Sequence, residues 1–182
     1  MRFSARKQGP HVVIVWQHPI LYPYTWHSHL LKHAATVKYL GVHISRDLRW
    51  HKHIEYITAK ANSTLGFVRR NVKISNPQVK ECAYNTLVWP ILEYSQTVWD
   101  LYTSGGVAKI ESVQRRAAWY TLNRYHRTSS VSAMIAQLNW QTLADRRRVA
   151  RLLMFYKIHY HLIAIDMPLS PKLHLQPTRT EN

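Results

Sequence analysis

The side chains best suited to metal-dependent phosphoryl transfer are carboxylates, and this sequence has few of them. Its nine acidic residues stand singly along the chain, with no two adjacent or one residue apart. They are Asp47, Glu55, Glu81, Glu93, Asp100, Glu111, Asp145, Asp166 and Glu181. Two-metal catalysis needs carboxylates that converge on ions about 3.5–4 Å apart, and such sites usually include a close pair. We therefore expect no catalytic residue and no bound metal in this chain.

Histidine and cysteine also carry metal-binding or nucleophilic chemistry. The histidines with zinc-like spacing are His27, His29 and His33, and then His51 and His53. With 12 histidines in 182 residues such pairs arise by chance, and no thiolate accompanies them, so packing explains them better than a metal does. The single cysteine, Cys82, is followed by Ala83 and Tyr84 in an expected helix, which predicts a buried side chain and not a nucleophile.

Arginines stand in clusters, and the chemistry of such clusters is the neutralisation of phosphate. The clusters are Arg69-Arg70, Arg115-Arg116 with Arg124 and Arg127, and Arg146-Arg147-Arg148 with Arg151. The chain has 25 Lys and Arg against nine Asp and Glu and a formal charge of +16, so its surface attracts polyanions. Nucleic acid is the leading partner class, although an acidic protein responds to the same field.

Strand-forming residues dominate the first 44 positions. The β-branched run Val12–Trp16 and the partly alternating segment Thr36–Ile44 predict two or three short strands. Gly41, inside the second segment, predicts a bulge or a close backbone approach.

Helical periodicity begins at Trp50. The first apolar stripe consists of Ile54, Ile57, Ala61, Leu65 and Val68. A second helix opens at Asn76-Pro77, a cap residue followed by proline, and its expected stripe is Val79, Ala83, Leu87 and Ile91. Pro90 predicts a kink there, or a junction of two shorter helices.

Three further helices are expected after this proline. One follows the predicted breaker Ser104-Gly105-Gly106 and presents Arg115 and Arg116 away from its apolar stripe. Ser129 and Ser130 cap a shorter helix that ends near Leu138. The last begins at Thr142 with the capping-box spacing to Asp145 and reaches about Leu162.

We therefore predict a mainly α chain, with a small N-terminal β-hairpin followed by a bundle of four to five helices and an extended C-terminal tail. The expected divisions are residues 1–46 for the hairpin, 47–165 for the helical domain and 166–182 for the tail. A lone cysteine and the lack of a long apolar run predict an intracellular protein, in the nucleus or cytoplasm, that is neither secreted nor bound to a membrane.

Several segments, in order and with consistent spacing, resemble one family. They are Lys38–Ile44, Asp47–Ile54, Ala61–Asn71, Thr86–Tyr94, Val98–Asp100, Gln114–Ala118, Tyr125–Ser130 and Leu143–Tyr156. Over roughly residues 24–160 the chain resembles the C-terminal part of the reverse transcriptases of non-LTR retrotransposons, LINE-like and of the Jockey type. Thr86–Tyr94 resembles the family's "LVRPxLEY" signature and Gln114–Ala118 its "QRRAA" segment, with Trp89 and Trp119 where the family usually has arginine.

The resemblance implies a fragment of an RNA-directed DNA polymerase. Residues 1–46 resemble the end of the palm, with Tyr39, Leu40 and Gly41 in a strand near the primer grip, and residues 47–165 resemble the helical thumb and connection. In the family this region holds a primer–template duplex through backbone charge. The residues expected to contact the backbone are Lys38, Arg69, Arg70, Arg115, Arg116, Arg146, Arg147 and Arg148.

The family's catalytic Asp-Asp pair, which binds Mg²⁺, and its fingers would lie upstream of Met1. We therefore expect this chain to be inactive alone, with RNA or DNA and the remaining palm and fingers of a polymerase as its partners. Two alternatives stay open, a non-functional retroelement relic and a basic helical protein-interaction domain.

Overall fold

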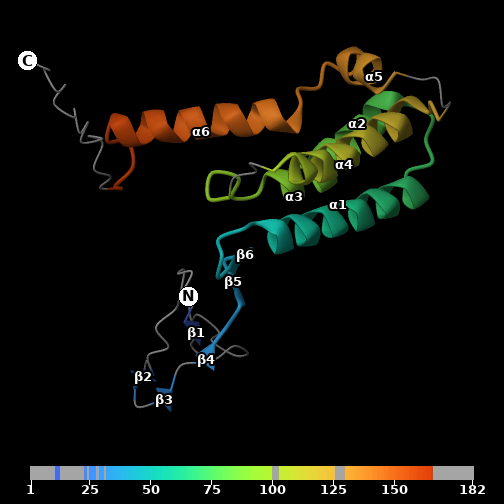
Figure 1. Cartoon of the computed structure of the whole chain (residues 1–182). Coiled ribbons are helices and arrows are strands. Elements are labelled where there is room, and N and C mark those ends of the chain that lie inside the picture. Colours follow the sequence, from blue (N-terminus) through green and yellow to red (C-terminus); the bar gives the residue numbers. More distant parts are fainter. Residues whose placement is uncertain are drawn as a thin grey trace, which may run out of the picture.

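The computed structural model describes residues 11–12, 23, 25–27, 29–30, 32–99, 103–125 and 130–165. Helices follow a small β region near the N-terminus, which confirms the mainly α fold (Figure 1). The strands are β1 (His11–Val12), β2 (Thr25–Trp26), β3 (His29–Leu30), β4 (Lys32–His33), β5 (Thr36–Tyr39) and β6 (Val42–Ser45). The helices are α1 (His51–Asn71), α2 (Pro77–Ala83), the π-helix η1 (Tyr84–Val88), α3 (Trp89–Glu93), α4 (Ser104–Leu122), α5 (Val131–Gln137) and α6 (Leu143–His159). The predicted tail, residues 166–182, lies outside the described residues.

The segment predicted as one strand with an irregular Gly41 is a hairpin. β5 and β6 pair antiparallel, with Tyr39 opposite Val42, and the turn between them is Leu40-Gly41. Both turn residues have positive φ, 44° and 85°, the backbone of a tight hairpin turn whose second position favours glycine. Gly41 is therefore not in a bulge, but the predicted close approach is confirmed, because an added Cβ would lie 3.2 Å from the Tyr94 ring.

Helix α1 forms as its periodicity predicts. All five stripe residues from Ile54 to Val68 are buried, and they face the rest of the helical body. The chain turns into α1 at Trp50 and leaves it at Val72, and the last turn of the helix contains Arg69 and Arg70. Those cations stand at the carbonyl end of the helix, where the helix dipole favours positive charge.

The α2–η1–α3 segment buries a different stripe from the predicted one. Val79 and Leu87 are exposed, and the buried residues are Lys80, Tyr84, Val88 and Leu92. Apolar residues stand on both neighbouring stripes, so periodicity alone does not distinguish them. The stripe that is buried contains a lysine, which made it look like the exposed one. Lys80 is only 4% exposed because its ammonium donates to the Tyr120 carbonyl, 3.3 Å away, and to the Asn123 side chain, 2.6 Å away.

The expected irregularity at Pro90 is confirmed as a junction. The backbone N–H of Trp89 donates to the carbonyl of Tyr84, five residues back, so the turn before the proline is widened into a π turn. A π turn is a usual way for a helix to absorb a local disruption, here a residue that has no N–H and crowds the preceding turn. The chain direction therefore continues from α2 into α3.

The three later helices begin where their caps predict, with one correction. Ser104-Gly105-Gly106 is the first turn of α4 and not a breaker before it. Ser130 caps α5 by accepting from the Ala133 N–H, and Thr142 caps α6 by accepting from the Asp145 N–H. Helix α6 ends at His159, slightly before the predicted Leu162.

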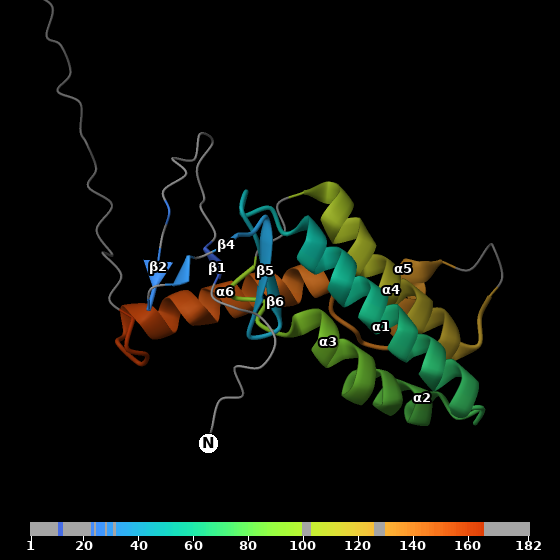
Figure 2. The ribbon, with the colours of Figure 1, turned by 90° about the horizontal axis from the view of Figure 1, so that it is seen from below.

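The helices pack around α1 and α4, which lie side by side (Figures 1 and 2). Glu55 of α1 contacts Lys109 of α4, and seven residues later Asn62 contacts Arg116, so the two helices run parallel with a constant offset. Helix α6 begins beside this body and extends past it, which Figure 1 shows in orange and red.

A buried histidine makes stability depend on pH. His53 in α1 is fully buried, its ring meets Trp99 edge-on at 5.2 Å, and its Nδ1 accepts from the His43 backbone N–H. Burial, helped by repulsion from His43, lowers the pKa of His53 from 6.5 to about 4. Burial and Lys38 and Lys52 lower the pKa of His43 in the same direction.

Because the unfolded chain binds these protons first, we expect the free energy of unfolding to fall as pH drops from 6.5 towards 4. The loss is at most about 1.4 kcal/mol per unit of pKa difference for each group. Urea unfolding at a series of pH values measures this slope, which His53→Gln should reduce and the exposed control His51→Gln should keep. Equal slopes in both variants would contradict the assignment.

Candidate nucleic-acid interface

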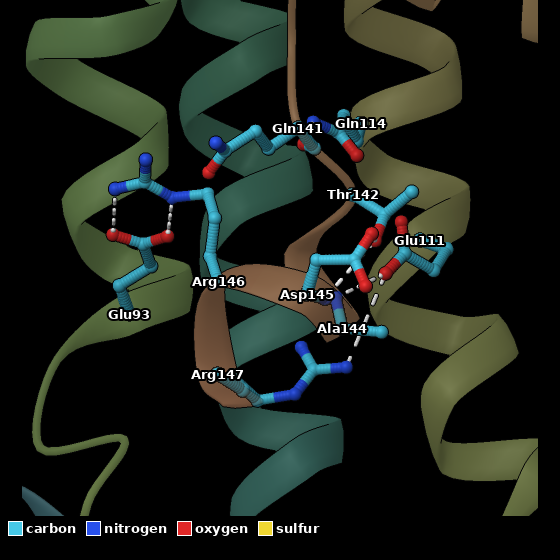
Figure 3. Close-up of polar contacts among 9 residues, drawn as sticks. All are labelled: Glu93, Glu111, Gln114, Gln141, Thr142, Ala144, Asp145, Arg146 and Arg147. Carbon is cyan, nitrogen blue, oxygen red and sulfur yellow. Dashed lines mark hydrogen bonds and ion pairs between the residues drawn. The ribbon is translucent and has the colours of Figure 1, made fainter. Parts of the chain in front are cut away.

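Every carboxylate in the described part of the chain already has a partner within the fold. Asp47 accepts from Ser45 and from the Arg49 N–H in the turn before α1. Glu55 pairs with Lys109 across α1 and α4, and Glu81 of α2 accepts from the Trp140 indole N–H at 2.7 Å. The others, Glu93, Glu111 and Asp145, converge on the first turn of α6 (Figure 3). The acidic side chains of the described residues therefore form hydrogen bonds and ion pairs within the fold.

Arg146, a predicted phosphate contact, is held by α3. Its guanidinium makes two parallel hydrogen bonds with the Glu93 carboxylate, and Nη2 lies 2.9 Å from Oε2 (Figure 3). Its Cζ lies 4.0 Å from the centre of the Trp89 ring, so the cation also stacks on that indole. The hydrogen bond to Glu93 raises the pKa of Arg146. Trp89, which stands where the family resemblance expects arginine, thus supports an arginine from another helix.

Arg147, the next predicted contact, is buried against α4. Its side chain is 5% exposed, and Nη2 lies 4.0 Å from the Glu111 carboxylate. Glu111 also accepts from the Ala144 backbone N–H at 2.8 Å, which satisfies one free donor of the first turn of α6. Since Arg146 and Arg147 are engaged inside the fold, we leave both out of the interface proposed below. Arg148 is exposed and has no partner among the described residues.

Three exposed cations, Arg69, Lys109 and Arg116, lie along the line where α1 and α4 meet. We call this line the α1–α4 seam and define it by Glu55, Asn62, Arg69, Lys109, Arg116 and Tyr125. Arg116 donates to Asn62 at 3.0 Å and to Ser112, both neutral groups, so its charge is uncompensated. The Cζ of Arg69 lies 5.8 Å from the centre of the Tyr125 ring. Glu55 is the one acidic side chain on the seam.

The remaining predicted contacts surround the seam at different distances. Arg70 follows Arg69 at the end of α1, and Arg115 lies beside Arg116 on the next face of α4, about 100° round the helix. Both are exposed and have no partner in the described chain. Lys38 stands on the hairpin beside Tyr56, so it is separated from Arg69 by about 20 Å along α1.

The hairpin residues that resemble a primer grip are exposed at its turn. Tyr39 and Leu40 face solvent, and the Leu40 carbonyl accepts from the hydroxyl of Tyr94, the residue after α3, at 2.9 Å. Sequence reasoning missed Tyr56, Lys60 and Tyr94, which the fold brings to the same hairpin. Their spacing carries no motif, because three separate elements meet there.

The other chemistry considered from sequence is not assembled in the described part of the chain. No group of three His, Cys, Asp or Glu side chains lies close enough to hold a metal ion in that part. Cys82 is exposed, contrary to the expected burial, because the buried stripe of α2 is displaced by one residue from the predicted one. None of the described helices has the length and apolar character needed to cross a membrane. Arg127 lies outside the described residues.

Comparisons of the chain with protein-family models, with curated proteins and with solved structures find no match. The likeness to non-LTR reverse transcriptases therefore stays a prediction, which rests on the sequence segments that carry it.

Glu93→Gln tests whether α3 holds α6 through this ion pair. The change leaves the half-buried Arg146 without a charged partner, and we expect it to lower the free energy of unfolding by about 2 kcal/mol. The matched control is Glu55→Gln, which breaks an exposed pair with Lys109 and should cost less than about 1 kcal/mol. Urea unfolding of both variants provides the comparison. A smaller loss in Glu93→Gln than in Glu55→Gln would refute this role.

Proposed function

We propose that this chain is a non-catalytic nucleic-acid-binding module, the thumb-like part of a retrotransposon reverse transcriptase that holds a primer–template duplex by backbone charge. The family assignment comes from the sequence resemblance. The observation that supports nucleic-acid binding is the division of charge, since each described carboxylate has an internal partner while Arg69, Arg70, Arg115 and Arg116 face solvent.

An extended positive surface suits a polyanion of regular spacing. From the hairpin to the end of α1 the cations span about 20 Å, which is roughly six phosphates of one strand at 3.4 Å each. Arginine and lysine contacts to phosphate position a duplex without reading its sequence. Catalysis and Mg²⁺ would belong to the palm of the intact enzyme, and palm and fingers are proposed as the protein partners of this module.

A second candidate, a basic helical protein-interaction domain, is favoured by the far half of α6. Its exposed side chains include Leu152, Leu153, Phe155 and Tyr156, of which Leu152 is 61% exposed. Large apolar groups gathered on one helix are typical of protein-binding surfaces. The third alternative, a relic without function, predicts the absence of a cooperative thermal transition, which calorimetry of the purified chain measures.

The seam predicts the salt dependence of binding. Fluorescence anisotropy with an RNA–DNA duplex should show affinity that falls with salt, because bound phosphates release counterions. The double variant Arg69→Gln/Arg116→Gln should reduce the slope of log affinity against log salt by about two.

The control for this variant removes the same charge elsewhere. Arg46→Gln/Lys157→Gln changes the turn before α1 and the far half of α6, and should leave the slope nearly unchanged. Absence of binding at low salt, or equal slopes in the two double variants, would count against the proposal. An acidic protein that nucleic acid fails to displace would favour the second candidate instead.

A further inference from the structure

A cavity of about 250 Å³ lies where the β5–β6 hairpin meets α1 and α3. The aromatic rings on it are Tyr56 from α1 and Tyr94, which directly follows α3, and apolar surface comes from Ile57 and Ile91. Pockets for drug-sized ligands usually measure ~300–1,000 Å³, and this cavity lies just below that range. Its shape depends on tertiary contacts between three elements.

The wall next to the hairpin is held in place by Tyr94. Its hydroxyl donates to the Leu40 carbonyl at 2.9 Å, and its ring lies against Gly41, where an added Cβ would come within 3.2 Å. Gly41 therefore serves both the positive φ of the turn and the close approach of the ring. The hairpin and α3 are joined at the cavity, which preserves its shape in the absence of a ligand.

The charged side chains that line the cavity in the described part of the chain are both positive. They are Lys38 and Lys60, and no described carboxylate lines it. The Lys38 ammonium donates to the Tyr56 hydroxyl at 3.2 Å and lies 4.8 Å from the centre of that ring, which leaves two N–H donors for a ligand. Lys60 has no side-chain partner in the described chain. The hydrogen bond from Lys38, with the charges of both lysines, lowers the pKa of Tyr56.

We infer that this cavity binds one unpaired nucleotide of a nucleic-acid strand, with its phosphate on Lys38 and Lys60 and its base against the tyrosine rings. Two ammonium groups lining one cavity match a phosphate, and the aromatic rings that line it with them match a base of any sequence. A paired base is stacked on both faces within its duplex, so an unpaired nucleotide is the form that fits. The inference rests on the proposed function and adds an end or a gap in the strand to what the module recognises.

Titration with adenosine 5′-monophosphate tests the cavity directly. In ¹H–¹⁵N spectra of the full chain, the amide signal of Gly41 should shift, while that of Gly66, farther along α1, should not. Inorganic phosphate and adenosine should each bind about tenfold more weakly, because each supplies one of the two contacts. Equal affinity for inorganic phosphate would reduce the cavity to an anion site and overturn the inference.

A comparison of two duplexes tests the same cavity on a strand. Wild-type protein should bind a duplex with one unpaired terminal adenosine about tenfold more tightly than the blunt duplex, which corresponds to ~1.4 kcal/mol. Lys60→Gln and Tyr56→Leu should bring this ratio close to one. The matched control is Lys52→Gln, on the same helix but outside the cavity, which should weaken both duplexes alike and keep the ratio.

The outcomes separate this inference from the proposed function. A ratio that is the same in all variants, with both duplexes bound, would overturn the nucleotide cavity and leave backbone binding intact. Loss of binding to both duplexes in the wild-type protein would overturn the proposed function. The shift of the Gly41 amide signal with adenosine 5′-monophosphate would then show by itself whether the cavity binds a nucleotide.

Discussion

The attachment of α6 to the rest of the fold depends on a few carboxylates and on their positions in neighbouring helices. Glu93 of α3 and Glu111 of α4 meet the first turn of α6 from two sides, one through Arg146 and the other through Arg147 and the Ala144 N–H (Figure 3). A half-buried arginine is stable only when its charge and donors are matched. Two acidic residues on α3 and α4 therefore anchor the first turn of the last helix to the rest of the helical body.

The same scarcity determines the character of the surface. Since Glu55, Glu81, Glu93 and Glu111 all tie one element to another, few negative charges remain to balance the exposed arginines. Exposed cations without an acidic partner then remain at the α1–α4 seam, in Arg69 and Arg116, and at the hairpin cavity, in Lys38 and Lys60. The seam lies on the side of α1 that faces α4 and the cavity on the side that meets α3, so the proposed backbone binding and the proposed nucleotide binding use two different sides of one helix.

Sequence patterns predicted the elements better than the roles of individual cations. The caps at Asn76, Ser130 and Thr142 were correct because capping depends on a few neighbouring residues. The three consecutive arginines of α6 were predicted to act alike, but on a helix they point about 100° apart, so Arg147 is buried, Arg146 is half-buried and Arg148 is exposed. The buried stripe of α2 was predicted wrongly because it contains Lys80. The burial of Lys80 depends on carbonyl and amide oxygens at the end of α4, 40 or more residues away.

Local order was thus decided by the amino-acid sequence: the helical class, the apolar stripe of α1, the helix starts and the excess of positive charge all follow from neighbouring residues and composition. Tertiary structure decided which cations remain exposed to solvent and which other side chains lie beside them. The parallel packing of α1 and α4 brings Arg116 to Asn62, and the meeting of the hairpin with α1 and α3 brings Lys38 to Tyr56 and encloses the cavity. Such contacts join residues far apart in the chain, and their geometry depends on the packing of whole elements, which no local pattern contains.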